Sequence, residues 1–394
     1  MPDQIQFAHR FDGITGSAIR DIFKLIAQPD MISFAGGNPS PAALPDAEAA
    51  RIAEAVLKEK GKQILQYGAT EGYPPFLESL KPYAEQAVGC PLPAILPTTG
   101  STQAMDLLCK ALIDPGDAIL VEDPSFLGNL QCMKFYQAKL IPVESDEGGL
   151  RMDKLEEAMA QHHPKMLYVI PNFQNPTGKT LASERRPKIA ELADRYHCVV
   201  AEDDPYRDLR YRGIFHPSIK SYDQAGWVVF MGSFSKIISP GIRVGWIAGD
   251  EDIIRKCTLG KQSTDVHTAN LTQAIVDRFL REDFLPGHLR RIRRDYAAQC
   301  DAMLAELEQF PAGVTYTRPE GGLFIWVELP EGVDAQALLT RAVERHVAFV
   351  PGTSFYADGG HANTFRLNFS NSTLEQIHTG MTALREVIAE ALNA

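Results

Sequence analysis

Short apolar runs alternate with helical stretches from about residue 94 onward, and this alternation limits the possible folds more than any other feature of the chain. Strand-like runs occupy residues 94–96, 118–121, 139–143, 166–170, 198–201, 228–231 and 244–248. Helical stretches separate the first five of them, at residues 101–113, 125–135, 152–162 and 182–195. This spacing predicts an α/β domain with a mostly parallel sheet. Because the apolar runs are nearly continuous, we expect both faces of the sheet to be covered.

The pattern changes after residue 280. A long charged helix is expected at 284–309, before shorter elements that read as strands at 314–317, 323–327, 348–350 and 364–369 and as helices at 334–345 and 373–392. This mixture predicts a second, smaller α+β domain.

The N-terminal part also carries recognisable elements. Residues 17–27 have helical spacing with Ser17 as N-cap, residues 32–35 read as a short strand, and residues 46–60 read as a helix capped by Asp46. We therefore expect three parts. These are an N-terminal segment (1–45) associated with the small domain and the site, a large domain (46–283) and a small domain (284–394).

Composition excludes several functions. The 394 residues are 45% hydrophobic and 23% charged, as in folded soluble proteins, and the net charge is −11. That balance argues against binding nucleic acid or an anionic membrane surface. The basic cluster at residues 290–294 invites a nucleic-acid interpretation, but an exposed helix face is the preferred one. No apolar run reaches membrane-spanning length, and no signal core is present at the N-terminus.

The six cysteines are scattered, without any C-x-x-C pair. We interpret them as reduced residues, mostly in apolar surroundings, of a cytoplasmic protein. They are Cys90, Cys109, Cys132, Cys198, Cys257 and Cys300.

A single lysine stands at the centre of the most informative motif. Residues 232–246 read GSFSKIISPGIRVGW, with Lys236 between hydroxyl residues and an arginine. A lysine that forms a Schiff base needs a water-poor setting that favours its neutral form. Ser233, Ser235 and Arg243 are suitable phosphate ligands. This combination suggests pyridoxal 5'-phosphate, whereas the alternative is an ordinary loop lysine beside a serine-rich turn.

Further polar residues follow the predicted strands, where ligands bind in an open α/β sheet. The stretch Thr99-Gly100-Ser101-Thr102-Gln103 opens a helix, so its backbone N–H groups could bind a phosphate; simple capping by Ser101 or Thr102 is the alternative.

Two later strand ends offer partners for a pyridine ring. A turn explains the proline and the glycine of the NPTG motif at residues 175–178. It does not explain Asn175, whose amide could reach a phenolic oxygen of the ligand. Tyr206 could donate to the same oxygen. A carboxylate in Glu202-Asp203-Asp204 could pair with the ring nitrogen, and only one aspartate should face it because neighbouring strand residues point to opposite faces. The alternatives are a metal site or surface acidity; a zinc-type site is not expected, because no His or Cys ligand set accompanies the acids.

Two more side chains are ambiguous until a ligand is considered. Phe126 could stack on the ring or be an ordinary core aromatic. Arg366 lies in a strand-like run, where a guanidinium is costly to bury unless it is paired, and a substrate carboxylate would be a good partner.

Taken together, these motifs resemble the fold-type I pyridoxal-phosphate enzymes of the class I/II aminotransferase family, nearest to its 2-aminoadipate and kynurenine aminotransferase branch. The resemblance implies a large domain with a mostly parallel seven-stranded sheet between helices, and a smaller α+β domain. The motifs occur in the family's order as FAGGNPSP (34–41), QYGATEGY (66–73), TTGSTQAMDL (98–107), NPTG (175–178), EDDPY (202–206), SFSKIISPGIRVGW (233–246) and FRLNFS (365–370).

The resemblance also implies roles for the cofactor contacts. Lys236 would be the Schiff-base lysine and proton shuttle. Asp203 has the family's D-x-x-Y spacing to Tyr206 and would pair with the ring nitrogen. Asn175 and Tyr206 would hold the phenolic oxygen. Phe126, where tyrosine is often found, would stack on the ring. The phosphate would be held by Ser101, Thr102, Ser233, Ser235 and Arg243, with Gly100 and Gln103 in the same loop.

The remaining implied roles concern the substrate and a second subunit. Arg366 and the Gly37 backbone would bind the α-carboxylate, beside Asn175. Arg20 would meet the substrate's distal group, although a neighbour such as Asp21 could pair with it instead. Tyr67 would reach the neighbouring subunit's phosphate, which implies a homodimer with shared active sites.

The expected activity is transfer of an amino group from an L-amino acid to a 2-oxo acid, with 2-oxoglutarate as acceptor, by a ping-pong mechanism. Another pyridoxal-phosphate reaction on this scaffold, such as C–S elimination or decarboxylation, is the first alternative. A transcription regulator with an aminotransferase-like domain is a distant one, because the family-like pattern leaves no room for a DNA-binding domain at the N-terminus. The preferred amino donor remains open.

Overall fold

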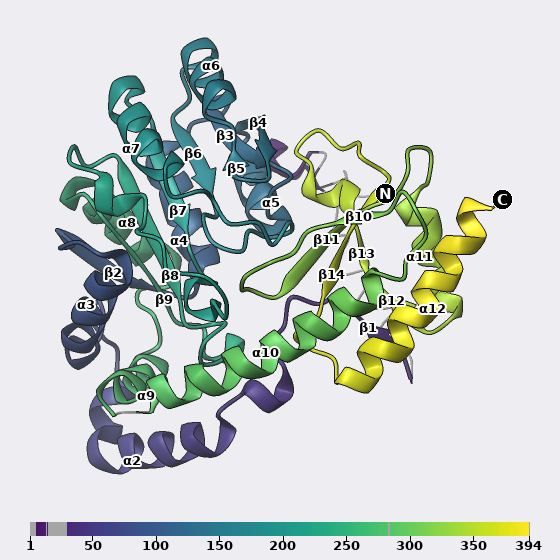
Figure 1. The fold of residues 1–394 in the computed structure, drawn as a ribbon. Coiled ribbons are helices and arrows are strands. Elements are labelled where there is room, and N and C mark those ends of the chain that lie inside the picture. Colours follow the sequence, from purple (N-terminus) through teal and green to yellow (C-terminus); the bar gives the residue numbers. More distant parts are fainter. Residues whose placement is uncertain (1–4, 13, 15–29, 283, 394) are drawn as a thin grey trace.

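The computed structural model describes residues 5–12, 14, 30–282 and 284–393. Its largest element is an eight-stranded sheet with the order β2-β9-β8-β7-β6-β3-β4-β5 (Figure 1). Five neighbouring strands, β4, β3, β6, β7 and β8, are parallel, and β9 runs antiparallel to both β8 and β2. The strands are β2 (Ala94–Thr98), β3 (Ala118–Asp123), β4 (Lys139–Asp146), β5 (Gly149–Leu150), β6 (Met166–Val169), β7 (Val199–Asp203), β8 (Val228–Ser233) and β9 (Gly245–Gly249).

The prediction of a mostly parallel sheet is confirmed, with one addition. All seven predicted runs are strands of this sheet, and β5 is an eighth strand of two residues that pairs antiparallel with β4. So short an element carries no periodicity of its own, since its pairing depends on the turn at residues 146–149.

Helices cover both faces of the sheet, as expected from the apolar strands. Along β6, Met166 and Tyr168 belong to one apolar cluster, while Leu167 and Val169 belong to the other. The large-domain helices are α2 (Asp46–Ile64), α3 (Pro74–Val88), α4 (Ser101–Leu112), α5 (Leu127–Phe135), α6 (Met152–His162), α7 (Arg185–Tyr196), α8 (Glu251–Thr264) and α9 (Asn270–Arg281).

The sequence interpretation missed some of these helices. It proposed none at α3, α8 or α9. It also proposed Asp46 as a cap, which is wrong: Asp46 is the first helical residue, and Pro45 occupies the N-cap position without a side-chain hydrogen bond. The expected helix at 17–27 lies outside the described residues.

The small domain has its own antiparallel sheet, ordered β10-β11-β14-β13. Helix α10 runs from the large domain to the small one, and α12 packs against it (Figure 1). Strand β1 (Ile32–Ser33) pairs with β12 (Val347–Ala348), which joins the N-terminal segment to the small domain. The other elements are α10 (Leu285–Leu307), β10 (Thr315–Tyr316), β11 (Phe324–Glu328), α11 (Ala335–Glu344), β13 (Val350–Pro351), β14 (Thr364–Asn368) and α12 (Leu374–Leu392). The exact domain boundaries stay a prediction.

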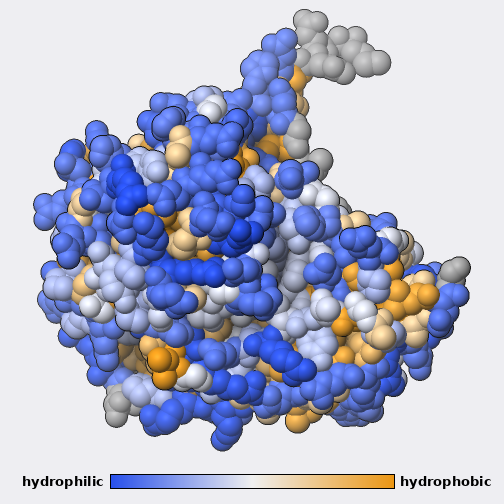
Figure 2. Space-filling view, turned by 45° about the horizontal axis from the view of Figure 1, so that its top comes forward, coloured by the Kyte–Doolittle hydropathy of each residue, from blue (hydrophilic) through white to orange (hydrophobic). Residues whose placement is uncertain are grey.

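The surface of the protein is largely polar. The face drawn in Figure 2 is mostly hydrophilic, with apolar side chains in small groups. No helix in the described ranges is both long and apolar enough to cross a membrane. The basic cluster lies on α10, where Arg291 donates to Ala42 O, Arg293 to Asp208 O and Arg294 to the Asp295 carboxylate. All six cysteines are free, and four of them are buried.

Candidate active site

A cavity of about 270 Å³ opens beyond the carboxyl ends of β6, β7 and β8, where the small domain meets the large one. It brings together residues from seven separate stretches of the chain. The lining consists of Gly37, Asn38, Ser101, Thr102, Phe126, Ile170, Asn175, Asp203, Pro205, Tyr206, Ser233, Ser235, Lys236, Pro240, Arg243 and Arg366. Most side chains singled out from the sequence therefore share one site.

Lys236 lies on the turn that follows β8. The neighbouring Phe234 is fully buried against Phe76 and Tyr83, and three backbone N–H groups close the turn on its carbonyl oxygen. This anchor fixes the lysine, whose Nζ donates to Gly37 O at 2.8 Å. Burial lowers the pKa of Lys236 to about 8, and the positive charges of Arg366 and Arg243 act in the same direction. Its setting therefore differs from that of an exposed loop lysine.

Asp203 ends β7 and presents one free carboxylate oxygen. Its Oδ2 accepts hydrogen bonds from Tyr168 Oη at 2.9 Å and Asn129 Nδ2 at 3.3 Å. Its Oδ1 is buried and has no hydrogen-bond partner among the described residues. Burial raises the pKa of Asp203 to about 7, against the effect of the Tyr168 hydrogen bond. A cationic N–H in the cavity would satisfy this oxygen and favour the ionised carboxylate.

The neighbouring aspartate does not line this cavity. Asp204 accepts from Asn172 Nδ2 at 2.7 Å, and its carboxylate is absent from the lining. The side chains of Asp203 and Asp204 point in opposite directions because side chains alternate along a strand. Across the described part of the chain, no group of three or more His, Cys, Asp or Glu side chains could hold a metal ion.

Arg366 is a fully buried guanidinium on β14. It donates to Asn175 Oδ1 at 2.8 Å and to Ala35 O at 2.7 Å, and it lies over the rings of Phe324 and Phe355. Its Nε has no partner within the described residues, and burial lowers its pKa to about 10. Because a buried cation is costly without a counter-charge, this site favours an anionic ligand.

Asn175 joins Arg366 to Tyr206. Its Nδ2 donates to Tyr206 Oη at 3.4 Å, while its Oδ1 accepts from Arg366. Burial raises the pKa of Tyr206 above its ordinary value, so the phenol keeps its proton and can donate to a ligand oxygen. These two side chains therefore present an amide and a phenol to the same part of the cavity.

The opposite end of the cavity suits an anion. Helix α4 begins here with Gly100 as N-cap, at φ 85°, so the capping role considered for Ser101 or Thr102 is wrong. Glycine is favoured at position 100 because a φ of 85° is strained for residues with a Cβ atom, and a Cβ atom there would also lie 2.5 Å from Arg243 Nη2. Hydroxyl groups from α4 and the β8 turn, the helix N-terminus and Arg243 converge in the way that phosphate sites do.

Three predicted contacts lie outside the cavity lining. The Gln103 side chain is directed toward Thr99, Lys261 and Asp265 instead. Tyr67 is 81% exposed and lies edge-on to His267. Gly100 contributes the helix start but does not line the cavity itself. Arg20 lies outside the described residues.

Sequence reasoning also missed several residues of the site. Asn129 and Tyr168 hold Asp203, while Asn38, Ile170, Pro205 and Pro240 line the cavity. Tyr168 could have been suspected, because a strand residue two positions before the cavity-lining Ile170 faces the same side. Asn129 offers no comparable signal, since its role depends on how α5 packs against β7.

Comparison with known proteins identifies the family. A family model described as aminotransferase class I and II matches residues 29–384. The chain is 40% identical over 394 residues to aromatic-amino-acid aminotransferase 1 of Thermococcus litoralis, covering 98% of this chain and 94% of that one. It is also 40% identical over 375 residues to 2-aminoadipate transaminase of Thermus thermophilus, covering 94% and 93%.

A solved structure gives the same result. The alpha-aminoadipate aminotransferase of Thermus thermophilus, complexed with N-(5'-phosphopyridoxyl)-L-leucine, is 37% identical, with a TM-score of 0.90 over 98% of both chains. The match therefore extends over the whole fold and not only over the motifs. On this evidence the protein belongs to the class I and II aminotransferases: it has their fold-type I architecture and is an enzyme of the transaminase class.

Proposed function

We propose that this aminotransferase holds pyridoxal 5'-phosphate in the interdomain cavity and transfers an amino group from an L-amino acid to a 2-oxo acid, with 2-oxoglutarate as acceptor. The observation that carries the proposal is the buried Oδ1 of Asp203, which has no partner in the described parts of the chain and which a protonated ring nitrogen would satisfy. The donor set around it also fits. Lys236 offers the amine that would hold the aldehyde carbon, and Asn175 and Tyr206 offer donors for the phenolic oxygen.

The phosphate group has its own contacts at the start of α4. Its ligands are the hydroxyl groups of Ser101, Thr102, Ser233 and Ser235 together with Arg243, with Gly100 as the close-approach glycine. Phe126 supplies an apolar face for the ring. When bound, the cofactor supplies an electron-withdrawing ring that stabilises negative charge at the substrate's Cα.

The protein's own side chains would transfer the proton and bind the substrate. Lys236 Nζ would take the proton from the substrate's Cα and would deliver it to the carbon that the cofactor's aldehyde contributes, and a pKa near 8 gives the amine a usable neutral fraction at neutral pH. Arg366, with the Gly37 backbone, binds the α-carboxylate and so orients the Cα–H bond toward that amine. The small-domain strand that carries Arg366 and the large-domain turn that carries Lys236 thus meet on one substrate.

The two substrates use the site in turn, in a ping-pong cycle. The amino acid leaves as a 2-oxo acid before the second 2-oxo acid enters, because Arg366 is the only buried guanidinium that lines the described part of the cavity. The names of the relatives make aromatic amino acids and 2-aminoadipate the first donors to test. Glutamate formed from 2-oxoglutarate would separate this reaction from C–S elimination or decarboxylation on the same site.

Two proposals extend beyond the described cavity. Tyr67 projects from the surface and would complete the phosphate site of a second subunit in a homodimer, so light scattering should give twice the chain mass. Arg20 would bind the distal group of the donor. Replacing Arg20 by Ala should change the ranking among donors more than the rate with a small neutral donor, and an unchanged ranking would remove it from the specificity site.

We place the enzyme in the cytoplasm, where its six free cysteines would stay reduced.

The central test replaces Lys236 by Ala in the purified enzyme. We expect turnover to fall to background, together with loss of the visible absorbance of the lysine-bound cofactor. Thermal unfolding of the cofactor-free variant controls for its fold. An active, yellow Lys236→Ala enzyme would contradict the proposal.

A further inference from the structure

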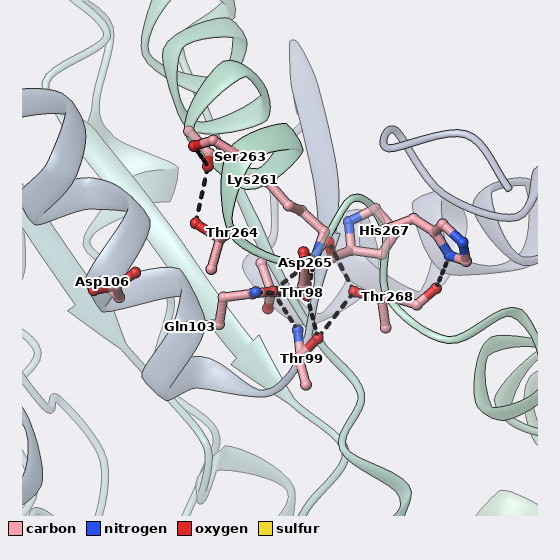
Figure 3. Close-up of polar contacts among 12 residues, drawn as sticks. Thr98, Thr99, Gln103, Asp106, Lys261, Ser263, Thr264, Asp265, His267 and Thr268 are labelled. Atoms are coloured by element: carbon pink, nitrogen blue, oxygen red, sulfur yellow. Dashed lines mark hydrogen bonds and ion pairs between the residues drawn. The ribbon is translucent and has the colours of Figure 1, made fainter. Parts of the chain in front are cut away.

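A partly buried polar cluster lies directly behind the proposed phosphate loop. It consists of Thr99, Gln103 from α4, Lys261 from α8, and Asp265, which follows α8 (Figure 3). Lys261 Nζ donates to both carboxylate oxygens of Asp265, at 2.9 Å each, and to Gln103 Oε1 at 2.7 Å. None of these four residues lines the cavity.

At the centre of the cluster is an ion pair in which Lys261 is fully buried and Asp265 is 27% exposed. The Lys261 side chain is 0% exposed, so its ammonium depends on these oxygens. Asp265 Oδ2 also accepts from Gln103 Nε2 at 2.7 Å and from Thr99 Oγ1 at 2.9 Å. A charge pair with this many hydrogen bonds is rigid, because removing one partner leaves the other uncompensated.

Thr99 links this ion pair to the proposed phosphate loop. Its N–H donates to Gln103 Oε1 at 2.8 Å, and its Oγ1 is held by Asp265. Its carbonyl oxygen accepts from Arg243 Nη2 at 3.0 Å. The next residue is Gly100, the N-cap of α4. The cluster therefore fixes both the start of the helix and the guanidinium that would face the phosphate.

The segment that connects α8 to α9 also contacts the loop that carries Tyr67. His267 Nε2 accepts from Gly68 N at 3.1 Å, and its ring packs edge-on against Tyr67. Thr268 Oγ1 lies 3.5 Å from Thr99 Oγ1. The connection between α8 and α9 thus contacts both parts of the chain to which a phosphate role has been given.

We propose that Lys261 and Asp265 are positioning residues for the phosphate end of the cofactor, an inference that rests on the proposed function. Asp265 aligns Thr99, and so sets the helix start and Arg243. Lys261 neutralises the Asp265 carboxylate, which would otherwise add negative charge close to a dianionic ligand. The pair acts on the phosphate contacts and not on the ring or the aldehyde.

The test compares two probes with the cofactor-free protein: pyridoxal 5'-phosphate, and pyridoxal, in which a hydroxyl replaces the phosphate. In Lys261→Met the dissociation constant for pyridoxal 5'-phosphate should rise about 10-fold or more, since a charge-assisted contact is lost. The constant for pyridoxal should change less than about 2-fold. Inorganic phosphate should compete with pyridoxal 5'-phosphate less effectively than in the wild type.

Two further variants keep the test decisive. In the double variant Lys261→Met/Asp265→Asn, the amide oxygen still accepts from Thr99 and Gln103 and no charge remains, so part of the lost affinity should return. Thr99→Val removes the hydroxyl that bonds Asp265 and Thr268 with little change in side-chain shape, and it should weaken binding a few-fold even if Lys261→Met does not fold.

A matched control is available in the same domain. Lys220 and Asp223 form another buried ion pair, 5% and 2% exposed, and neither lines the cavity. Asp223→Asn should lower the unfolding temperature while leaving both dissociation constants unchanged.

The outcomes separate this inference from the proposed function. Equal weakening of pyridoxal and pyridoxal 5'-phosphate, no weakening in Thr99→Val, or no recovery in the double variant would each overturn the positioning role. If the wild type bound pyridoxal 5'-phosphate without competition from inorganic phosphate, the proposed cofactor site would itself be wrong.

Discussion

Replacing the central lysine should make the cofactor-free protein more stable. Lys236 holds an ammonium in a buried site beside two guanidinium groups, Arg366 and Arg243, and among the described residues its Nζ has one hydrogen bond, to Gly37 O. Methionine has a similar length and no charge. We therefore expect Lys236→Met to abolish activity and to stabilise the fold at neutral pH, as when a site is built for function against stability.

The size of the expected stabilisation follows from the lowered pKa of Lys236. Burial lowers the pKa of Lys236 from 10.5 to about 8, which corresponds to about 3 kcal/mol at neutral pH, since each pKa unit is worth about 1.4 kcal/mol. Loss of the hydrogen bond to Gly37 offsets about 1 kcal/mol. The net stabilisation is therefore about 2 kcal/mol, which should raise the unfolding temperature of a chain this long by a few degrees.

The difference in stability between Lys236→Met and the wild type should depend on pH. Below pH 8 the folded and unfolded states both hold the proton, so the wild type carries the full penalty. Between pH 8 and 10.5 the unfolded state binds more protons than the folded state, so the wild type gains stability as the pH rises. The advantage of Lys236→Met should therefore be largest near pH 7 and should disappear by about pH 10.5.

The assay is thermal unfolding of the cofactor-free wild type and variant at a series of pH values from 7 to 10.5. Lys58→Met is the control, because Lys58 is 73% exposed in a surface ion pair with Glu54 and should change stability little. A Lys236→Met protein that is less stable than the wild type at pH 7 would refute the reasoning. So would a stabilisation that does not change with pH.

Two further predictions concern catalysis. Arg366→Lys should lower kcat/KM about 100-fold for both amino and oxo acids in steady-state assays, because a point charge does not replace the buried planar fork; an effect on only one of the two would argue against a shared carboxylate site. Tyr168→Phe removes a hydrogen bond that favours ionised Asp203, so the pKa of Asp203 should rise further above its ordinary value. The acidic limb of the pH–rate profile should move to higher pH, with Tyr222→Phe as a control at a tyrosine that is 39% exposed, and an unmoved limb would separate Tyr168 from the reaction.

Local patterns in the sequence determined the architecture well. Each of the seven apolar runs read as strands between residues 94 and 248 is a strand of the eight-stranded sheet, because period and hydrophobicity are properties of neighbouring residues. The same logic failed where the local signal is weak. Strand β5 has two residues, and α3 begins after a glycine-rich loop with two prolines, which reads as a turn.

The site could be predicted only in part. Residues at strand ends, such as Asp203 and Asn175, had to meet at one edge of a parallel sheet, and that much follows from topology. The family resemblance chose Asp203 over Asp204, and the directions of the two carboxylates agree with it.

Only the tertiary structure decided what each polar side chain contacts. Gln103 lies in the phosphate-loop motif, yet its amide is used by Asp265, which is 162 positions away, and by Lys261. The lowered pKa of Lys236 likewise depends on burial and on Arg366 from another domain. Strand and helix periods are local and can be read along the chain. Hydrogen bonds and electrostatic fields between distant segments arise only when packing brings those segments together.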